Sequence, residues 1–264
     1  MPTALVTGAS RGIGAAFAAR FARDGYDLVL VARDRDALER VAAAARERGV
    51  AAEVLVADLT DERDLVAVQD RLADRSRPVD LLVNNAGVKC RGDFIALDKW
   101  GLQAEIDTNV TAVMRLTHAA LPGMTERGRG AVVNVASFAG YLAGPGDAYA
   151  ATKAWVLTFT DTIAASLAGS GVRMMAMCPG PVRTSMHPVP GASSGTPWLE
   201  PEAVVDTAMA DLARGRTLSV PGWRYRAVVE VLELPRRTLR TVARLAGRGR
   251  ARMAADRRPQ VPVD

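Results

Sequence analysis

Tyr149 and Lys153 are four positions apart, a spacing that places two side chains on the same face of a helix. An ammonium group beside a phenol favours the phenolate and lowers the pKa of the phenol from about 10, so this tyrosine can serve as a general acid or base. Lys153 is also one of three lysines in a chain whose other cationic side chains are arginines, and an ammonium group and a guanidinium are not interchangeable. Taken alone, a tyrosine and a lysine four positions apart usually lie on a solvated helix face. The catalytic interpretation therefore needs support from other positions.

A glycine-rich segment follows the first apolar run of the chain and precedes an amphipathic segment. Glycines between a strand and a helix let the backbone approach a pyrophosphate held at the helix N-terminus. The spacing is one residue longer than the common dinucleotide fingerprint, and the alternative is an ordinary glycine-rich turn. The candidate cofactor contacts in this loop are Gly8, Ser10, Arg11, Gly12, Ile13 and Gly14.

Three further motifs occur in a fixed order along the chain. Asn84-Asn85-Ala86-Gly87 closes the fourth expected strand, Ser137 follows the fifth, and Pro179 to Thr184 follow the sixth. Together with the glycine loop and the Tyr149/Lys153 pair, they resemble the short-chain dehydrogenase/reductase family over nearly all of residues 1–184. The resemblance implies an oxidoreductase that reduces a ketone or aldehyde to an alcohol by hydride transfer, with Tyr149 as the general acid.

The resemblance also implies a role for each site residue. Ser137 would orient the substrate oxygen, Lys153 would bind the nicotinamide ribose, and Asn109 would hold a water that links Lys153 to solvent. Asp58 matches the family position that contacts the adenine ring, with a helix N-cap as the alternative. The remaining cofactor contacts that the resemblance implies are Leu59, Asn85, Ala86, Gly87, Tyr149, Lys153, Pro179, Gly180, Val182 and Thr184.

Two arginines indicate the choice of cofactor. Arg33 ends the second expected strand, where an NAD-specific enzyme would place a carboxylate to bind the ribose 2′-hydroxyl. A guanidinium there favours a 2′-phosphate, and Arg11 can meet the same phosphate from the other side. Asp34 would repel the phosphate if it turned inward, but the family pattern implies that it faces solvent. The sequence therefore predicts NADP(H).

Short apolar runs alternate with amphipathic segments rich in Ala, Arg and Leu. This alternation predicts an α/β fold with a single Rossmann-type doubly wound parallel sheet and helices on both faces. The apolar runs lack a period of two, as expected of strands that are covered on both faces. We expect one domain over 1–246, with strands near 3–7, 27–32, 52–57, 79–84, 130–136, 172–178 and 216–220 and helices near 12–24, 35–48, 61–75, 100–120 and 148–168 and from Pro201.

The segment after residue 184 is rich in proline, glycine and serine, and we expect a mobile lid loop over 185–200. Its Met186, Pro188, Val189 and Trp198 suit an apolar substrate. A final amphipathic helix is expected over 224–246, followed by a basic, disordered tail over 247–264.

The net charge of +5 is concentrated at the C-terminal end, where residues 224–264 hold 11 arginines against four acidic residues. The expected helix there has an apolar stripe, which predicts packing on its own domain or in a homodimer or homotetramer interface, with a membrane surface as the alternative. The tail has too few aromatic residues to stack on bases, so no nucleic-acid partner is expected. The stripe consists of Val228, Val231, Leu232, Leu239, Val242 and Leu245.

The chain begins without the basic region and apolar core of a signal peptide, and we expect a cytoplasmic protein. Cys90 and Cys178 have the spacing of neither a disulfide framework nor a metal site, so free thiols and no metal are expected. We expect structural roles for His118 and His187. Two functional alternatives stay open: an alcohol dehydrogenase that runs the same chemistry oxidatively, and a regulator that senses NADP(H) without turnover.

Overall fold

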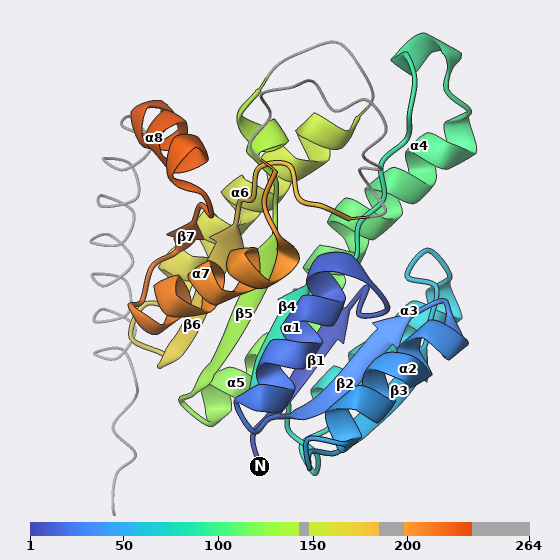
Figure 1. Ribbon diagram of the computed structural model, residues 1–264, viewed down its shortest axis with the longest axis vertical. Helices are drawn as coiled ribbons and strands as arrows, with labels where there is room; N and C mark the ends of the chain where they lie inside the picture. Colours follow the sequence, from blue (N-terminus) through green and yellow to red (C-terminus); the bar gives the residue numbers. More distant parts are fainter. Residues whose placement is uncertain (143–147, 185–197, 234–264) are drawn as a thin grey trace, which may run out of the picture.

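The computed structural model describes residues 1–142, 148–184 and 198–233, and a seven-stranded parallel sheet forms its centre (Figure 1). The strand order is β3-β2-β1-β4-β5-β6-β7. This arrangement confirms the doubly wound α/β fold. The strands are β1 (Thr3–Thr7), β2 (Asp27–Ala32), β3 (Ala52–Val56), β4 (Leu81–Asn84), β5 (Gly130–Val135), β6 (Val172–Met177) and β7 (Leu218–Ser219).

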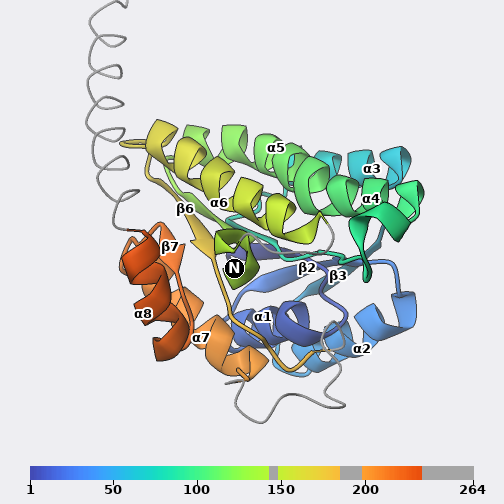
Figure 2. The same ribbon diagram turned by 90° about the horizontal axis from the view of Figure 1, so that it is seen from above.

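Helices cover both faces of the sheet, as Figure 2 shows from above. One face carries α1 (Gly12–Arg23), α2 (Arg35–Arg46) and α7 (Pro201–Ala213); the other carries α3 (Glu62–Ala73), α5 (Ala112–Glu126) and α6 (Tyr149–Ser166). Smaller elements are α4 (Lys99–Ile106), the π-helical segment η2 (Asp107–Thr111), the 3₁₀ turns η1 (Phe94–Ala96) and η3 (Phe138–Tyr141), and α8 (Trp223–Leu232).

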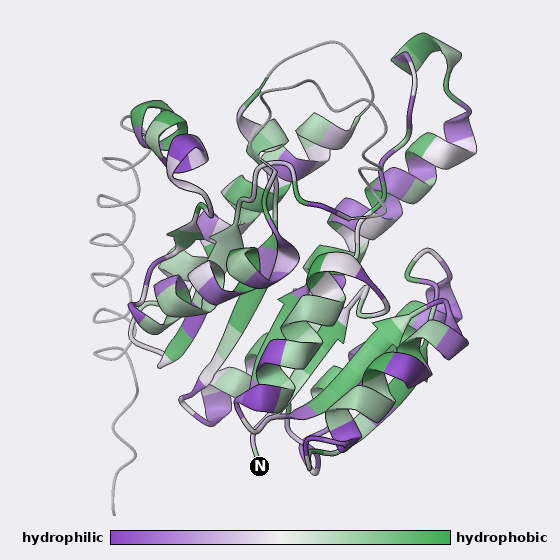
Figure 3. Cartoon of the chain, viewed as in Figure 1, coloured by the Kyte–Doolittle hydropathy of each residue, from purple (hydrophilic) through white to green (hydrophobic). Residues whose placement is uncertain are grey.

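Burial on both faces explains why the strands lack alternation. Ala4, Leu5 and Val6 in β1 are consecutive and fully buried, because helices pack on each side of the sheet. Two separate apolar layers result, one around Phe17 and Phe21 of α1 and one around Leu116 of α5. Figure 3 shows the same pattern, with hydrophobic strands at the centre and hydrophilic residues on the outer faces of the helices.

The expectation of one helix near 100–120 is confirmed at its start but is wrong at its end and in its regularity. The helical stretch begins at Lys99, passes through η2 and continues to Glu126, with Pro122 inside α5. Proline costs a helix one backbone hydrogen bond, but Gly123 and Met124 beyond it are buried, so packing holds the last turn against the sheet. The strand expected over 216–220 is also shorter, because only Leu218 and Ser219 pair with β6.

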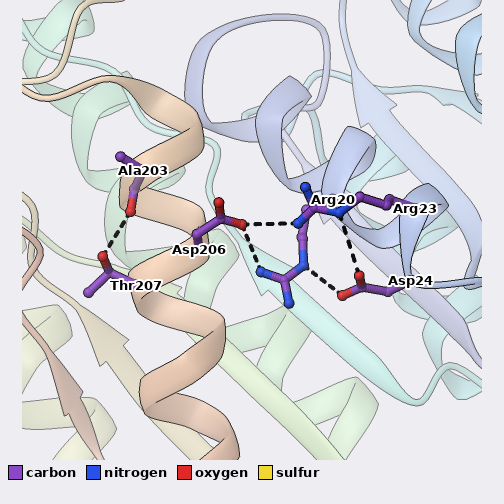
Figure 4. A network of polar contacts seen from close by, with 6 residues as sticks. All are labelled: Arg20, Arg23, Asp24, Ala203, Asp206 and Thr207. Atoms are coloured by element: carbon purple, nitrogen blue, oxygen red, sulfur yellow. Dashed lines mark hydrogen bonds and ion pairs between the residues drawn. The ribbon is translucent and has the colours of Figure 1, made fainter.

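An ion-pair network fixes α7 against α1 (Figure 4). Arg20 of α1 donates hydrogen bonds to Asp24 at 2.7 Å and to Asp206 of α7 at 2.8 Å, and Arg23 reaches Asp206 at 3.2 Å. Exposed pairs contribute little each, so the apolar contacts between the two helices carry the packing. Pro201 opens α7 at its first turn, as predicted.

Several predictions fall on residues outside the described ranges. They concern most of the lid loop, His187, the C-terminal helix beyond Glu233 and the basic tail. In the described part of the final helix, Val228, Val231 and Leu232 are exposed. No helix in the described part of the chain is long and apolar enough to cross a lipid bilayer.

Candidate active site

The strands β1 and β4 are neighbours although two strands separate them along the chain, so the strand order reverses between them. Ligands of doubly wound sheets bind at this switch point, outside the carboxyl ends of the strands. A cavity of about 500 Å³ lies there, within the usual size range of ligand pockets. Its lining comes from the segments that follow β1 to β6 and from the first turns of α6.

Thr7 and Asn85 join the two strands at the switch point. The Thr7 hydroxyl donates to the Val83 carbonyl at 3.3 Å and accepts hydrogen bonds from the backbone N–H groups of Asn85 and Ala86, both at 3.0 Å. The Asn85 amide in turn donates to the carbonyls of Thr7 at 2.8 Å and Gly8 at 3.2 Å. These hydrogen bonds fix the position of the glycine loop relative to the residues that follow β4.

The glycine loop needs glycine for two reasons. Gly8 has a φ of +64°, and a Cβ there would lie 2.9 Å from the Ala86 backbone. A Cβ on Gly14 would lie 2.1 Å from the Gly8 carbonyl oxygen, so Gly14 lets α1 start directly under the loop. Gly14 therefore supports the loop from behind and does not line the cavity, whereas Gly8, Ser10, Arg11, Gly12 and Ile13 do.

Arg33 and Asp58 form an ion pair at 3.6 Å where β2 and β3 end. Partial burial would raise the pKa of the Asp58 carboxyl, but hydrogen bonds from Thr60 and the charge of Arg33 hold that pKa below its usual value. The Asp34 carboxylate accepts a hydrogen bond from the Ala37 N–H at 3.0 Å and caps α2. This cap directs the charge of Asp34 toward the helix N-terminus, although Asp34 still belongs to the cavity lining.

Ser137 lies two residues after the end of β5 and caps η3. Its hydroxyl oxygen accepts a hydrogen bond from the Ala139 N–H at 3.2 Å, while the Phe138 N–H binds the Pro179 carbonyl at 3.0 Å. Gly140 brings this turn against α6, because a Cβ there would lie 2.8 Å from the Lys153 backbone. A hydroxyl that accepts one hydrogen bond can still donate its own proton, and Ser137 lines the cavity.

Tyr149 and Lys153 occupy the first turns of α6, and both line the cavity. The Lys153 ammonium lies 5.6 Å from the centre of the Tyr149 ring and donates to the Val135 carbonyl at 2.9 Å. Burial lowers the pKa of Lys153 to about 8, against an opposing contribution from the negative charge of Glu105. A protein accepts a buried ammonium group at such cost chiefly where function needs it.

Asn109 lies in the π-helical segment η2 and is fully buried. Its amide accepts from the Val88 N–H at 3.0 Å and donates to the Val88 carbonyl at 2.8 Å and the Thr152 hydroxyl at 3.1 Å. A Cβ on Gly87 would lie 3.3 Å from the Asn109 oxygen and 3.5 Å from the Lys153 nitrogen. Asn109 therefore does not line the cavity but holds the segment after β4 next to Lys153. π-Helical turns often mark functional sites.

Apart from Gly14 and Asn109, all the predicted site residues line one cavity. Sequence reasoning missed a group of small and apolar residues at strand ends, which no chemical pattern distinguishes. It also missed Lys89, for which a lysine in an arginine-rich chain was the available signal. The lining residues not predicted as site residues are Val31, Ala32, Asp34, Ala57, Val88, Lys89, Thr108, Val135 and Ala136.

The free energy of unfolding should record the cost of the buried ammonium. Because the pKa of Lys153 falls from 10.5 to about 8 on folding, its charge destabilises the folded protein by about 3 kcal/mol below pH 8. Between pH 8 and 10.5 the unfolded chain binds more protons, so this cost disappears as the pH rises. Relative to that of the Lys153→Met variant, the free energy of unfolding of the native protein should therefore rise by about 3 kcal/mol between pH 7 and 10.5, as measured by urea denaturation. The exposed Lys99→Met should show no such gain, and a pH-independent difference for Lys153→Met would contradict the lowered pKa.

Comparisons with known proteins agree with this geometry. A family model described as short chain dehydrogenase matches residues 2–191. The chain is 38% identical over 221 residues to the oxidoreductase UcpA of Escherichia coli, and the matched region covers 83% of this chain and 82% of UcpA. A short-chain dehydrogenase from Sphingobium yanoikuyae, solved in complex with NADPH, superposes with a TM-score of 0.83 at 36% identity and covers 100% of this chain and 99% of that one. The bulky-bulky ketone specific alcohol dehydrogenase from Comamonas testosteroni gives a TM-score of 0.81 at 32% identity, with 91% and 94% covered.

Proposed function

The chain belongs to the short-chain dehydrogenase family, and from this premise we propose that it is an NADPH-dependent reductase that converts a ketone or aldehyde to an alcohol. Family membership makes it an oxidoreductase of carbonyl and alcohol groups. The direction of the reaction and the proton donor are our proposal. One observation carries it: a single cavity holds cationic Arg11 and Arg33 together with Ser137, Tyr149 and Lys153.

The two groups of residues lie on opposite sides of the switch point. Arg33 follows β2 and Ser137 follows β5, with β1 and β4 between them in the sheet. An elongated dinucleotide would fit across these strand ends, with its pyrophosphate at the N-terminus of α1. The glycine loop supports this fit, because Gly8 lines the cavity with its backbone alone, and a side chain there would collide with the Ala86 backbone and displace the loop.

NADP(H) is the cofactor that we assign to this cavity. Arg33 and Arg11 would bind the 2′-phosphate at one end, and Lys153 would bind the nicotinamide ribose at the other. The related dehydrogenase from Sphingobium yanoikuyae holds NADPH, which supports the same choice here. When bound, the cofactor supplies the hydride.

The proposed roles of the three polar residues follow from their contacts. Ser137 donates its proton to the substrate carbonyl oxygen and orients it, since its own oxygen is engaged by the Ala139 N–H. Tyr149 donates the proton that completes the alcohol. Lys153 uses one N–H on the Val135 carbonyl and keeps two for other partners, while its positive charge stabilises the phenolate that Tyr149 becomes.

Asn109 contributes by position. Its amide fixes both backbone groups of Val88 and thereby the wall beside Lys153. The same set of residues runs in reverse when Tyr149 acts as a base, so supply of the reduced or oxidised cofactor decides the direction. A regulator that only senses NADP(H) would need neither the Ser137 hydroxyl nor the Tyr149 hydroxyl in the cavity.

A substrate panel tests the proposal. The purified full-length protein should oxidise NADPH, followed by its absorbance, in the presence of at least one class among aliphatic ketones, aromatic ketones and aldehydes. It should form the corresponding alcohol in equal amount. NADPH binding without turnover of any ketone, aldehyde or alcohol would favour the sensing alternative.

A further inference from the structure

Lys89 is a cavity residue to which the proposed reaction gives no role. It follows β4 by five positions, its side chain is exposed, and it lines the cavity. Its ammonium lies 5.3 Å from the centre of the Tyr149 ring, as near as the Lys153 ammonium at 5.6 Å. Tyr149 therefore has a cation from each of two different segments beside its ring.

The backbone on both sides of Lys89 is held by buried side chains. Asn109 binds the N–H and the carbonyl of Val88, and a carboxylate oxygen of the fully buried Glu105 accepts from the Cys90 N–H at 3.3 Å. A long lysine side chain normally loses much conformational freedom when it binds a ligand. Anchoring on both sides reduces the freedom of the base of this chain before any ligand arrives.

Charge around the cavity is distributed unevenly. Among the described lining residues, the carboxylates are Asp34 and Asp58, and both lie near Arg33. No carboxylate of the described lining lies beside Tyr149, and Lys89 forms no ion pair with any described residue. The Lys153 ammonium is buried and bonded to Val135, so among the described lining residues Lys89 is the accessible cation at this end.

We propose that Lys89 forms an anion subsite beside Tyr149, so that the preferred substrate is a carbonyl compound carrying a carboxylate, sulfonate or phosphate group near its carbonyl carbon. The inference rests on the proposed function and specifies its substrate class. With the carbonyl oxygen at the Tyr149 hydroxyl, an anionic group about two or three bonds away would come within reach of the Lys89 ammonium, which lies 5.3 Å from the centre of the Tyr149 ring. Lysine suits this task, because its flexible point charge can meet any of the three anions.

Matched acids and esters test the subsite. We would measure kcat/KM with NADPH for 3-oxobutanoate and 4-oxopentanoate against their methyl esters, which keep the ketone and lose the charge. The acid should exceed its ester by about tenfold or more in the native protein, as expected for one charge-assisted hydrogen bond. The ratio should fall to about one in Lys89→Met and below one in Lys89→Glu, and it should decline with added salt because Lys89 is exposed.

Lys99→Met is the matched control, since Lys99 is an exposed lysine of the same region that does not line the cavity. It should keep the native ratio. The proposal is overturned by a native ratio near one, or by a ratio that Lys89→Met leaves unchanged. An equal loss of kcat/KM for acid and ester in Lys89→Met would also overturn it. That result would mean that Lys89 acts on the Tyr149 hydroxyl or, if NADPH binds more weakly, on the cofactor.

A binding measurement separates this inference from the proposed function. Pentanoate, which cannot be reduced, should bind the NADP⁺-loaded native protein in saturation-transfer NMR and should lose binding in Lys89→Met but not in Lys99→Met. If no ketone or aldehyde is turned over, the proposed function fails, while this result still decides the subsite. Binding that Lys89→Met leaves intact would overturn the subsite even in an active enzyme.

Discussion

Tyr149→Phe should lower kcat by about a thousandfold or more while NADPH affinity changes by no more than a few-fold. Phenylalanine keeps the ring beside the Lys89 and Lys153 ammonium groups and removes only the hydroxyl that we propose as the proton donor. The loss should appear in kcat and kcat/KM together, because a proton donor acts in the transition state. Steady-state kinetics and a fluorescence titration with NADPH measure the two quantities.

Tyr26→Phe is the matched control. Tyr26 packs against Phe21 in the core and does not line the cavity, so loss of its hydroxyl should leave turnover unchanged. Retention of most activity in Tyr149→Phe would remove Tyr149 from the mechanism. It would leave the fold and the cofactor site untouched.

Native protein should prefer NADPH over NADH in kcat/KM by at least about tenfold, and Arg33→Asp should weaken or reverse this preference. Hydrogen bonds from charged groups contribute about 1.5 to 3 kcal/mol each. Two such bonds, from Arg33 and Arg11, would give a preference for NADPH of more than about a hundredfold. We take tenfold as the lower bound because the Arg33 side chain is 67% exposed and water screens it. An aspartate at 33 would repel the 2′-phosphate and could accept a hydrogen bond from the 2′-hydroxyl of NADH.

Arg35→Asp provides the same change in charge two positions away. Arg35 opens α2, is exposed and does not line the cavity, so its replacement should leave the cofactor ratio near the native value. A native preference for NADH would contradict the assignment of Arg33 and Arg11. The Ser137, Tyr149 and Lys153 chemistry would still stand.

The edge at which the site forms could be predicted without a structure. Each candidate motif follows an apolar run, and the carboxyl ends of the parallel strands in a doubly wound sheet lie along one edge. Loops as distant in sequence as those at Gly8, Asn85, Ser137 and Pro179 must then converge. This reasoning needs only the alternation of strands and helices, which local periodicity encodes.

Contacts between distant side chains were decided by packing. Thr7 joins β1 to the end of β4, and Glu105 binds the backbone next to Lys89, but no local pattern relates either pair. Lys89 in particular belongs to no motif, and its being a lysine in an arginine-rich chain was the one signal that the sequence offered. Hydrogen bonds from the buried Asn109 and Glu105 hold the backbone on both sides of Lys89.

The sequence by itself determined the doubly wound fold, the edge of the sheet that carries the site and most of the residues that line the cavity there, because local periodicity encodes the alternation of strands and helices and each motif has a fixed place in it. The tertiary structure decided which of those residues face the cavity, that Asn109 and Gly14 act from behind it, and that Lys153 has a pKa lowered to about 8. The physical reason is that exposure, charge and close approach depend on neighbours that folding brings from elsewhere in the chain.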